Sequence, residues 1–236
     1  MKAIVTAILF FSVLQISGCV SDQISSPAND IPSAVVGTEP LGKSNADHGQ
    51  KVLYSENFSK SARGWVKVDG PGLLAVVGVV FKHTTPGYSV WCEYAYAPQM
   101  FGNARYALDV FVDNQTLATS FVWRAPNLQT VTADGGGYLA TFNNSGLAPG
   151  PAGHFTVEKL DRNGRTILLD IANQFLGLNR LVIEDKGTSI KVSINGVSYG
   201  PINVTNLTPP QSGYIFLIGG DRGAGDYFDN IKIRGL

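Results

Sequence analysis

Cysteine and charge are both scarce in this 236-residue chain. It has only two cysteines, so a disulfide framework cannot be what holds the fold together. Charged residues make up 15% of the chain, and 18 basic residues balance 18 acidic ones, which gives a formal net charge of zero. A general nucleic-acid binder needs a clustered basic excess, so this balance argues against that class.

Glycine, proline and apolar residues are what the chain has in quantity. There are 27 glycines and 12 prolines, and hydrophobic residues account for 44% of the chain, which is enough to fill a core. A chain of this length makes one domain of ordinary size or two small ones. The composition is typical of a β-rich protein with many turns, and less so of a helical bundle.

The N-terminus has the pattern of an export signal. Lys2 precedes an apolar run from Ala3 to Leu14, which is too short to span a membrane. The run ends in Ile16-Ser17-Gly18-Cys19, which resembles the lipobox of bacterial lipoproteins. The resemblance implies that residues 1–18 are removed and that Cys19 is lipidated. The alternative is an ordinary secretory peptide with an incidental cysteine.

The segment after Cys19 predicts a tether. Residues 20–50 are rich in Ser, Pro, Asn, Asp and Gly without periodicity, as expected of a flexible linker. Val20 and Ser21 follow the cysteine, and by resemblance to lipoproteins the absence of Asp there favours the outer membrane. We therefore expect a signal peptide at 1–18, a lipidated cysteine with its tether at 19–50, and a folded domain at 51–236 in the cell envelope.

From Lys51 onward the apolar residues alternate with polar ones, and Gly, Pro, Asn and Asp interrupt the runs. Ile167–Leu178 comes nearest to a helix, but Gly177 limits it. Asn195-Gly196 is the strongest hairpin signal, because both residues tolerate a positive φ. The pattern predicts an all-β fold of two antiparallel sheets. The expected strands are Val52–Phe58, Gly64–Val68, Leu73–Val80, Tyr88–Tyr96, Arg105–Val112, Ser120–Arg124, Tyr138–Phe142, His154–Leu160, Leu181–Glu184, Ser189–Ile194, Tyr214–Ile218 and Tyr227–Ile233.

Several of these strands resemble the concanavalin A-like lectin and glucanase superfamily. The resemblance rests on Glu56-Asn57-Phe58 with Gly64-Trp65, on Asn179–Glu184 with Ile190–Gly196, and on Gly213–Gly219 with Tyr227–Ile233. It implies a jelly-roll β-sandwich over most of 51–236. It leaves the function open, because this fold is found in lectins, adhesins, hydrolases and lyases.

Alternation along the middle strands predicts a polar outer face. If Cys92 and its period-two neighbours are buried, the outward set includes an aromatic ring, carboxylates and guanidinium groups, which together suit a sugar. The alternative is a solvated face with incidental ion pairs, each contributing at most about 1 kcal/mol. The candidate ligand-binding residues are Trp91, Glu93, Arg105, Asp109 and Arg124.

The last strand suggests a structural calcium ion. Asp229 shares its face with Ile231 and Ile233, so the alternation predicts that its carboxylate points into the core, where it must be paired or metal-bound. In related sandwiches an acid here and one near the first strand often hold Ca²⁺, and Glu56 lies in the matching segment. The alternative is a carboxylate that accepts backbone N–H groups.

The sequence contains few signs of a catalytic site. Glu93 and Asp109 lie on consecutive expected strands, but no Glu-x-Asp-x-x-Glu string of the glucanases is present. Cys92 is expected to be a buried apolar residue rather than a nucleophile. The loop Asp221–Asp226 is a further candidate for sugar or metal binding. We expect a lipid-anchored carbohydrate-binding domain without catalysis; the alternatives are a glycoside hydrolase or polysaccharide lyase, and a structural or adhesive surface lipoprotein.

Overall fold

The computed structural model describes residues 49–85, 91–114, 116–129, 136–144, 152–161, 164–207, 210–220 and 225–236. The predictions for the signal peptide, for Cys19 and for nearly all of the tether lie outside these residues. Within them the one helical element is a short 3₁₀ turn, η2 (Thr205–Leu207), and no helix there is long and apolar enough to cross a membrane.

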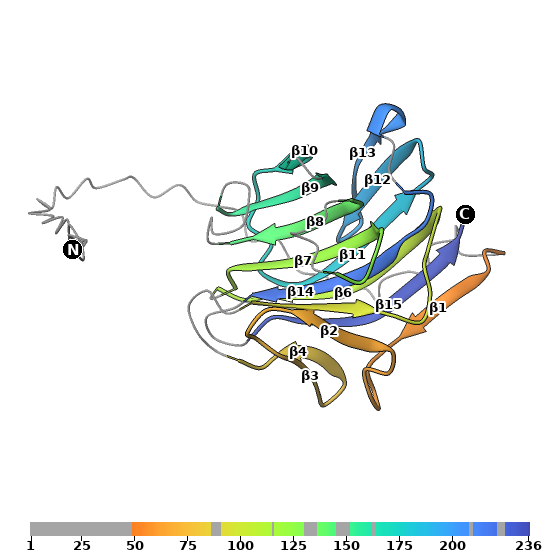
Figure 1. The fold of residues 1–236 in the computed structure, drawn as a ribbon. Coiled ribbons are helices and arrows are strands. Elements are labelled where there is room, and N and C mark those ends of the chain that lie inside the picture. The colour runs from red at the N-terminus through yellow and green to blue at the C-terminus, as the bar shows by residue number, and fades with distance from the viewer. Residues whose placement is uncertain are drawn as a thin grey trace, which may run out of the picture. The chain divides into compact units, whose positions relative to one another are not determined.

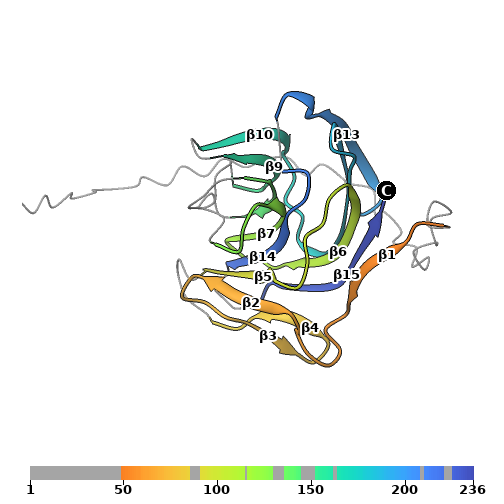
Figure 2. The same ribbon diagram turned by 45° about the vertical axis from the view of Figure 1, so that its right-hand side comes forward.

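The strands form two antiparallel sheets that face each other, as Figures 1 and 2 show. The eight-stranded sheet runs in the order β13 (Val197–Asn203), β12 (Ser189–Ile194), β11 (Gly177–Asp185), β6 (Ala104–Val112), β15 (Tyr227–Gly235), β4 (Val80–His83) and β3 (Leu74–Val77), and β1 (Val52–Glu56) also pairs with β15. The seven-stranded sheet runs in the order β10 (Gly164–Ile171), β9 (His154–Asp161), β8 (Tyr138–Asn143), β7 (Ala118–Ala125), β14 (Tyr214–Gly220), β5 (Trp91–Tyr96) and β2 (Trp65–Asp69). The predicted β-sandwich is confirmed.

The core lies between the two sheets and follows the predicted alternation. On β6, Tyr106 and Leu108 are fully buried, whereas Asp109 on the other side of the strand is half-buried. Cys92 belongs to the same core, and burial raises the pKa of its thiol to about 12. A thiol with that pKa stays protonated at neutral pH, so Cys92 is the inert buried residue that the sequence predicts.

A smaller apolar cluster lies on the outer face of the seven-stranded sheet. Val122 and Phe216 are fully buried there, and Leu128, in the segment after β7, packs against them. Part of this face is therefore covered, and its polar side chains are not all open to solvent.

The structure adds strands that the sequence pattern did not predict. Part of the segment Ile167–Leu178 belongs to edge strand β10, and Val197–Asn203 forms edge strand β13. The expected strand Leu73–Val80 is divided at Gly78 into the hairpin β3–β4. The predicted hairpin at Asn195-Gly196 is confirmed, with φ of 52° and 85° at the two turn residues.

Candidate functional site

The five predicted ligand-binding residues lie in three separate places. Trp91 and Glu93 are on β5, on the outer face of the seven-stranded sheet. Arg105 and Asp109 are on β6, on the outer face of the eight-stranded sheet. Alternation indicates which side of a strand a residue occupies, but it does not indicate which sheet the strand joins. The prediction of one shared face is wrong for this reason.

Arg124 departs from the alternation because β7 contains a bulge. Its φ is 58°, and the pairing between β14 and β7 shifts register at this point. A bulge inserts an extra residue and re-aims a side chain. Trp123 and Arg124 therefore both point between the sheets, and Arg124 is only 2% exposed. The prediction that Arg124 lies on an outer face is wrong.

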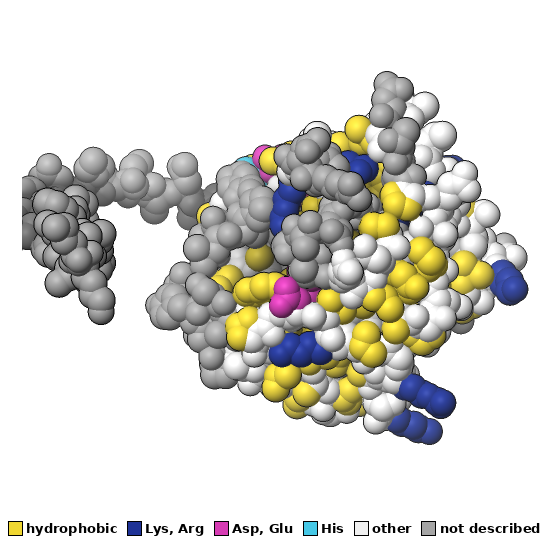
Figure 3. All heavy atoms as spheres, viewed as in Figure 1, with side chains coloured by type: hydrophobic (Ala, Val, Ile, Leu, Met, Phe, Trp, Pro, Cys, Tyr) yellow, Lys and Arg dark blue, Asp and Glu magenta, His cyan; other side chains and the backbone are white. Residues whose placement is uncertain are grey.

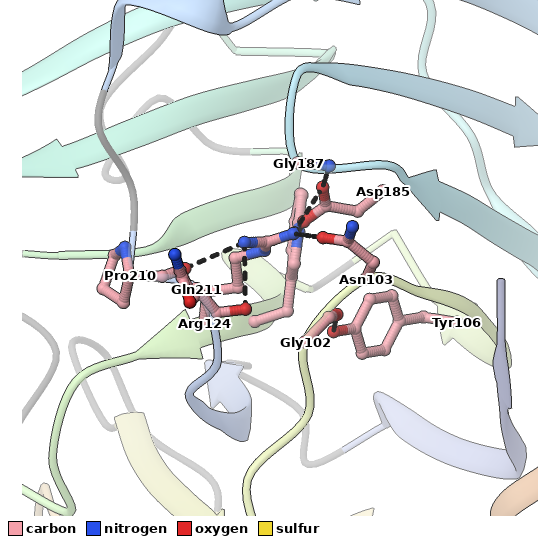
Figure 4. Close-up of polar contacts among 9 residues, drawn as sticks. Gly102, Asn103, Tyr106, Arg124, Asp185, Gly187, Pro210 and Gln211 are labelled. Carbon is pink, nitrogen blue, oxygen red and sulfur yellow. Dashed lines mark hydrogen bonds and ion pairs between the residues drawn. The ribbon is translucent and has the colours of Figure 1, made fainter.

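Figure 4 shows how the buried Arg124 guanidinium is held. Its Nε and Nη2 donate to the two carboxylate oxygens of Asp185, at 2.5 and 2.9 Å, and Nη2 also donates to Asn103 Oδ1 at 2.7 Å. Its Nη1 donates to the carbonyl oxygens of Pro210 and Gln211, at 2.8 and 3.2 Å. A guanidinium has five N–H donors, so none remains for a sugar. Arg124 joins the two sheets instead.

Arg105 and Asp109 form ion pairs on the eight-stranded sheet. Arg180 Nη1 donates to Asp109 Oδ1 at 2.8 Å, and Asn230 Nδ2 donates to Asp109 Oδ2, also at 2.8 Å. Arg105 pairs with Glu184 at 3.5 Å. These side chains are partly exposed, so each pair contributes at most about 1 kcal/mol to stability. This surface therefore matches the alternative interpretation of the sequence, a solvated sheet face with ion pairs.

Asp229 faces outward, contrary to the prediction. A register shift lies between Asp229 and Lys232, and Asn230 adopts a φ of 49°. This bulge separates Asp229 from the buried Ile231 and places it opposite Asp109. Partial burial raises the pKa of Asp229, and the nearby carboxylates of Asp109 and Glu56 act in the same direction.

The oxygens around Asp229 do not by themselves make up a calcium site. Glu56 Oε1 accepts from the backbone N–H groups of Asn57 and Phe58, at 2.9 and 2.8 Å. Asp229 Oδ1 is the one carboxylate oxygen in this neighbourhood that is buried without a hydrogen-bond partner. Among the described residues no three His, Cys, Asp or Glu side chains are grouped to hold a metal, whereas Ca²⁺ takes six to eight oxygens.

A row of residues crosses one end of the seven-stranded sheet on its outer face; we call it the end row. Trp91 on β5 lies opposite Gly220 on β14. A Cβ added at Gly220 would lie 3.8 Å from Trp91 Cβ and 3.1 Å from the Ala118 carbonyl oxygen, so Gly220 sits between these residues. Ala118 on β7 lies opposite Asn143 on β8, which lies opposite His154 on β9.

The two ends of the end row differ in their neighbours. Trp91 and His154 are both half-buried; Gly220 and Ala118, on the Trp91 side, carry little side chain, whereas Asn143, beside His154, is a buried polar residue. Four strand spacings separate the two ends, which makes the row about 19 Å long. His154 Nδ1 lies 2.6 Å from Asp170 Oδ1 on β10.

Behind the end row lies a second set of polar side chains, and these are buried. Glu93 lies on the outward side of β5, as predicted, but it is only 1% exposed. The prediction that its carboxylate contacts solvent is therefore wrong. Ser120 and Thr141 share a hydrogen bond of 2.9 Å between their hydroxyls. One outward Ser or Thr on each of β7, β8 and β9 was the sequence signal for this polar face, and none of the three was among the predicted residues: Ser120, Thr141 and Thr156.

Two further candidates from the sequence are a carboxylate pair and a loop. Glu93 and Asp109 lie in different sheets and cannot form a catalytic carboxylate pair. Most of the loop Asp221–Asp226 lies outside the described residues. Its last residue, Asp226, is fully buried, accepts a 2.8 Å hydrogen bond from the Thr119 hydroxyl and lies 3.6 Å from the His83 ring.

Comparison with known proteins finds solved structures of similar fold. No protein family and no curated protein matches the chain. A protein of unknown function with a galectin-like fold from Bacillus subtilis superposes with a TM-score of 0.61 and 12% identity, covering 78% of this chain and 97% of that one. The VIP36 exoplasmic/lumenal domain in its Ca²⁺-bound form gives 0.56 and 14%, covering 77% and 90%. The carbohydrate-binding module CBM66 from Bacillus subtilis gives 0.55 and 14%, covering 73% and 96%. At these identities the likeness shows the jelly-roll fold alone.

Proposed function

We propose that the sandwich binds carbohydrate along the end row and does not hydrolyse it. The observation that carries the proposal is the half-buried Trp91 beside Gly220. An aromatic ring is an effective binding surface because it offers a rigid apolar face at small entropic cost. Gly220 is itself buried, but it has no side chain of its own that could cover the neighbouring indole.

The far end of the end row supplies polar contacts. His154 and Asp170 are both accessible, with side chains 24% and 40% exposed. A carboxylate that holds an imidazole fixes its orientation, so the ring can present its other nitrogen to a hydroxyl group. The distance of about 19 Å between Trp91 and His154 suits an extended oligosaccharide or polysaccharide better than a single sugar.

The structures of similar fold support the proposal. A carbohydrate-binding module is among them, and the same architecture also carries other functions. The absence of hydrolysis is proposed because the two carboxylates chosen from the sequence, Glu93 and Asp109, are in separate sheets. Glycosidases need their pair about 5–9.5 Å apart, so Glu93 and Asp109 cannot serve as such a pair.

Replacing Trp91 by alanine should weaken glycan binding about tenfold or more, because loss of a stacking aromatic ring costs 1.4 kcal/mol or more. The wild-type domain is first screened on a glycan array, and the affinity for the best neutral oligosaccharide is then measured by calorimetry. Tyr227→Ala is the matched control, since Tyr227 is a half-buried aromatic residue on the opposite sheet. It should leave the affinity unchanged.

Unchanged binding by the Trp91 variant, with its melting curve intact, would remove the end row as the binding site. The array is also run with calcium and with chelator. A structural Ca²⁺ at Glu56 and Asp229 remains a prediction, supported by the unpartnered Oδ1 of Asp229. Equal binding and equal melting under both conditions would leave calcium without a role.

We also propose that the chain is held at the outer membrane by lipid on Cys19. Support comes from the apolar leader and the lipobox-like string before this cysteine. In a Gram-negative host, Cys19→Ala should move the protein from the membrane fraction to the soluble fraction, because the acyl chains are lost. Cys92→Ala is the control and should stay with the membranes. Retention of the Cys19 variant on the membrane would contradict the anchor.

A further inference from the structure

The tip of the β3–β4 hairpin is apolar where turns are usually polar. Val77 pairs with Val80, and Gly78 and Val79 form the two-residue turn between them, with a φ of 65° at Gly78. Val77 is 47% exposed and Val79 is 58% exposed. Turn positions favour Gly, Asn, Asp and Ser, so two exposed valines at a protruding turn need an explanation beyond folding.

Two more exposed apolar residues lie elsewhere on these strands. Leu73, at the open end of the hairpin before β3, is 48% exposed, and Val66 on β2, a strand of the other sheet, is 43% exposed. Figures 1 and 2 both show β2 beside β3 and β4 at the lower end of the molecule. β3 is also the last strand of its sheet. Proteins normally protect such an edge with charge or cover, so this surface is suited to a partner.

The segment that includes the hairpin is positively charged, although the net charge of the whole chain is zero. Residues 59–84 contain four basic side chains and one acidic one, Asp69. Figure 3 shows basic side chains standing out around the lower part of the molecule, where no acidic one is visible in that view. The four basic residues of the segment 59–84 are Lys60, Arg63, Lys67 and Lys82.

We propose that the tip of the β3–β4 hairpin, formed by Val77 and Val79, docks on the surface of an anionic lipid bilayer. The exposed valine side chains enter the boundary between headgroups and acyl chains, and the surrounding lysines and arginine approach the phosphates. The combination of protruding apolar residues with basic neighbours selects this occupant over an uncharged protein surface. The contact is independent of glycan binding at Trp91.

The test uses Asn45–Leu236, which forms one compact unit with its own core. This protein carries no lipid and is cosedimented with vesicles of phosphatidylcholine containing phosphatidylglycerol, and with vesicles of phosphatidylcholine alone. We expect binding to the anionic vesicles that weakens at high salt. The double variant Val77→Ser with Val79→Ser should lower the partition coefficient about tenfold, because the apolar transfer free energy is lost.

Two further variants complete the test. Val197→Ser makes the same change at a valine that is 56% exposed on β13 and should not affect vesicle binding. Trp91→Ala should also bind vesicles normally, which separates this proposal from the glycan site. No binding by the wild type, or equal binding by the double variant, would overturn the proposal. So would a wild-type dimer in sedimentation velocity that the double variant loses, because a second copy would then cover the tip.

Discussion

Asp185→Ala is expected to lower the melting temperature of the sandwich by about 6–20 °C. Asp185 is fully buried, and it pairs with Arg124, which is 2% exposed. Removing one partner of a buried pair leaves the other charged without compensation, which costs about 3–5 kcal/mol. In a domain of this size each kcal/mol lowers the melting temperature by about 2–4 °C.

Asp185 connects three parts of the structure. Besides Arg124, it accepts a 3.0 Å hydrogen bond from the Trp123 indole and a 2.8 Å bond from the backbone N–H of Gly187. Trp123 and Arg124 belong to the seven-stranded sheet, and Asp185 ends β11 of the other sheet. The loss therefore reaches both layers of the sandwich at one end.

Thermal unfolding followed by circular dichroism measures the effect. Asp109→Ala is the matched control, because Asp109 also accepts from an arginine, Arg180, but this pair is partly exposed and should contribute less than about 1 kcal/mol. Replacing Arg124 and Asp185 together by leucine should recover part of the loss, since no unpaired charge remains. Equal melting shifts for Asp109→Ala and Asp185→Ala would contradict the argument.

Gly213→Ala is expected to destabilise the domain by about 3 kcal/mol, the upper end of what overpacking usually costs. A Cβ at Gly213 would lie 2.3 Å from the carbonyl carbon of Arg124 and 2.5 Å from the Ala125 oxygen. These are backbone atoms of the β7 bulge and cannot move without displacing the Arg124 side chain. On the other side of the bulge, a Cβ at Gly137 would lie 2.5 Å from the Trp123 oxygen.

Gly213 is the better position for this test because, unlike Gly137, it does not need a positive φ. The destabilisation then measures steric contact alone. Chemical denaturation gives the free energy of unfolding, and Gly235→Ala serves as the control, since a Cβ there meets nothing within 4 Å. Similar stability of the two variants would show that the β7 bulge can shift to accommodate the added methyl group. A glycine in contact with the backbone of Arg124 would then not be required.

Most of the fold could be predicted from the sequence because alternation is a local property. The buried side of β6 and the hairpin at Asn195-Gly196 follow from period two and from turn chemistry. The edge strands β10 and β13 were not predicted, because both of their faces are largely exposed. Their residues therefore lack the contrast between apolar and polar positions that identifies a strand.

The candidate site was predicted in part. Trp91 was assigned to the correct side of its strand, and it remains the centre of the proposed binding surface. Gly220 and His154 were not chosen, because their importance comes from lying opposite Trp91 and Asn143 on neighbouring strands. Cross-strand neighbours are set by pairing between distant segments, which a single sequence does not reveal.

The sequence by itself determined an all-β sandwich, its core residues, and which side of each regular strand faces that core. Only the tertiary structure decided which sheet each strand joins, and it separated Glu93 from Asp109. It also decided the two bulges, at Arg124 and Asn230, that reverse the expected directions of Arg124 and Asp229. The physical reason is that side-chain direction follows local backbone geometry, whereas sheet membership and bulges depend on hydrogen bonds between segments far apart in the chain.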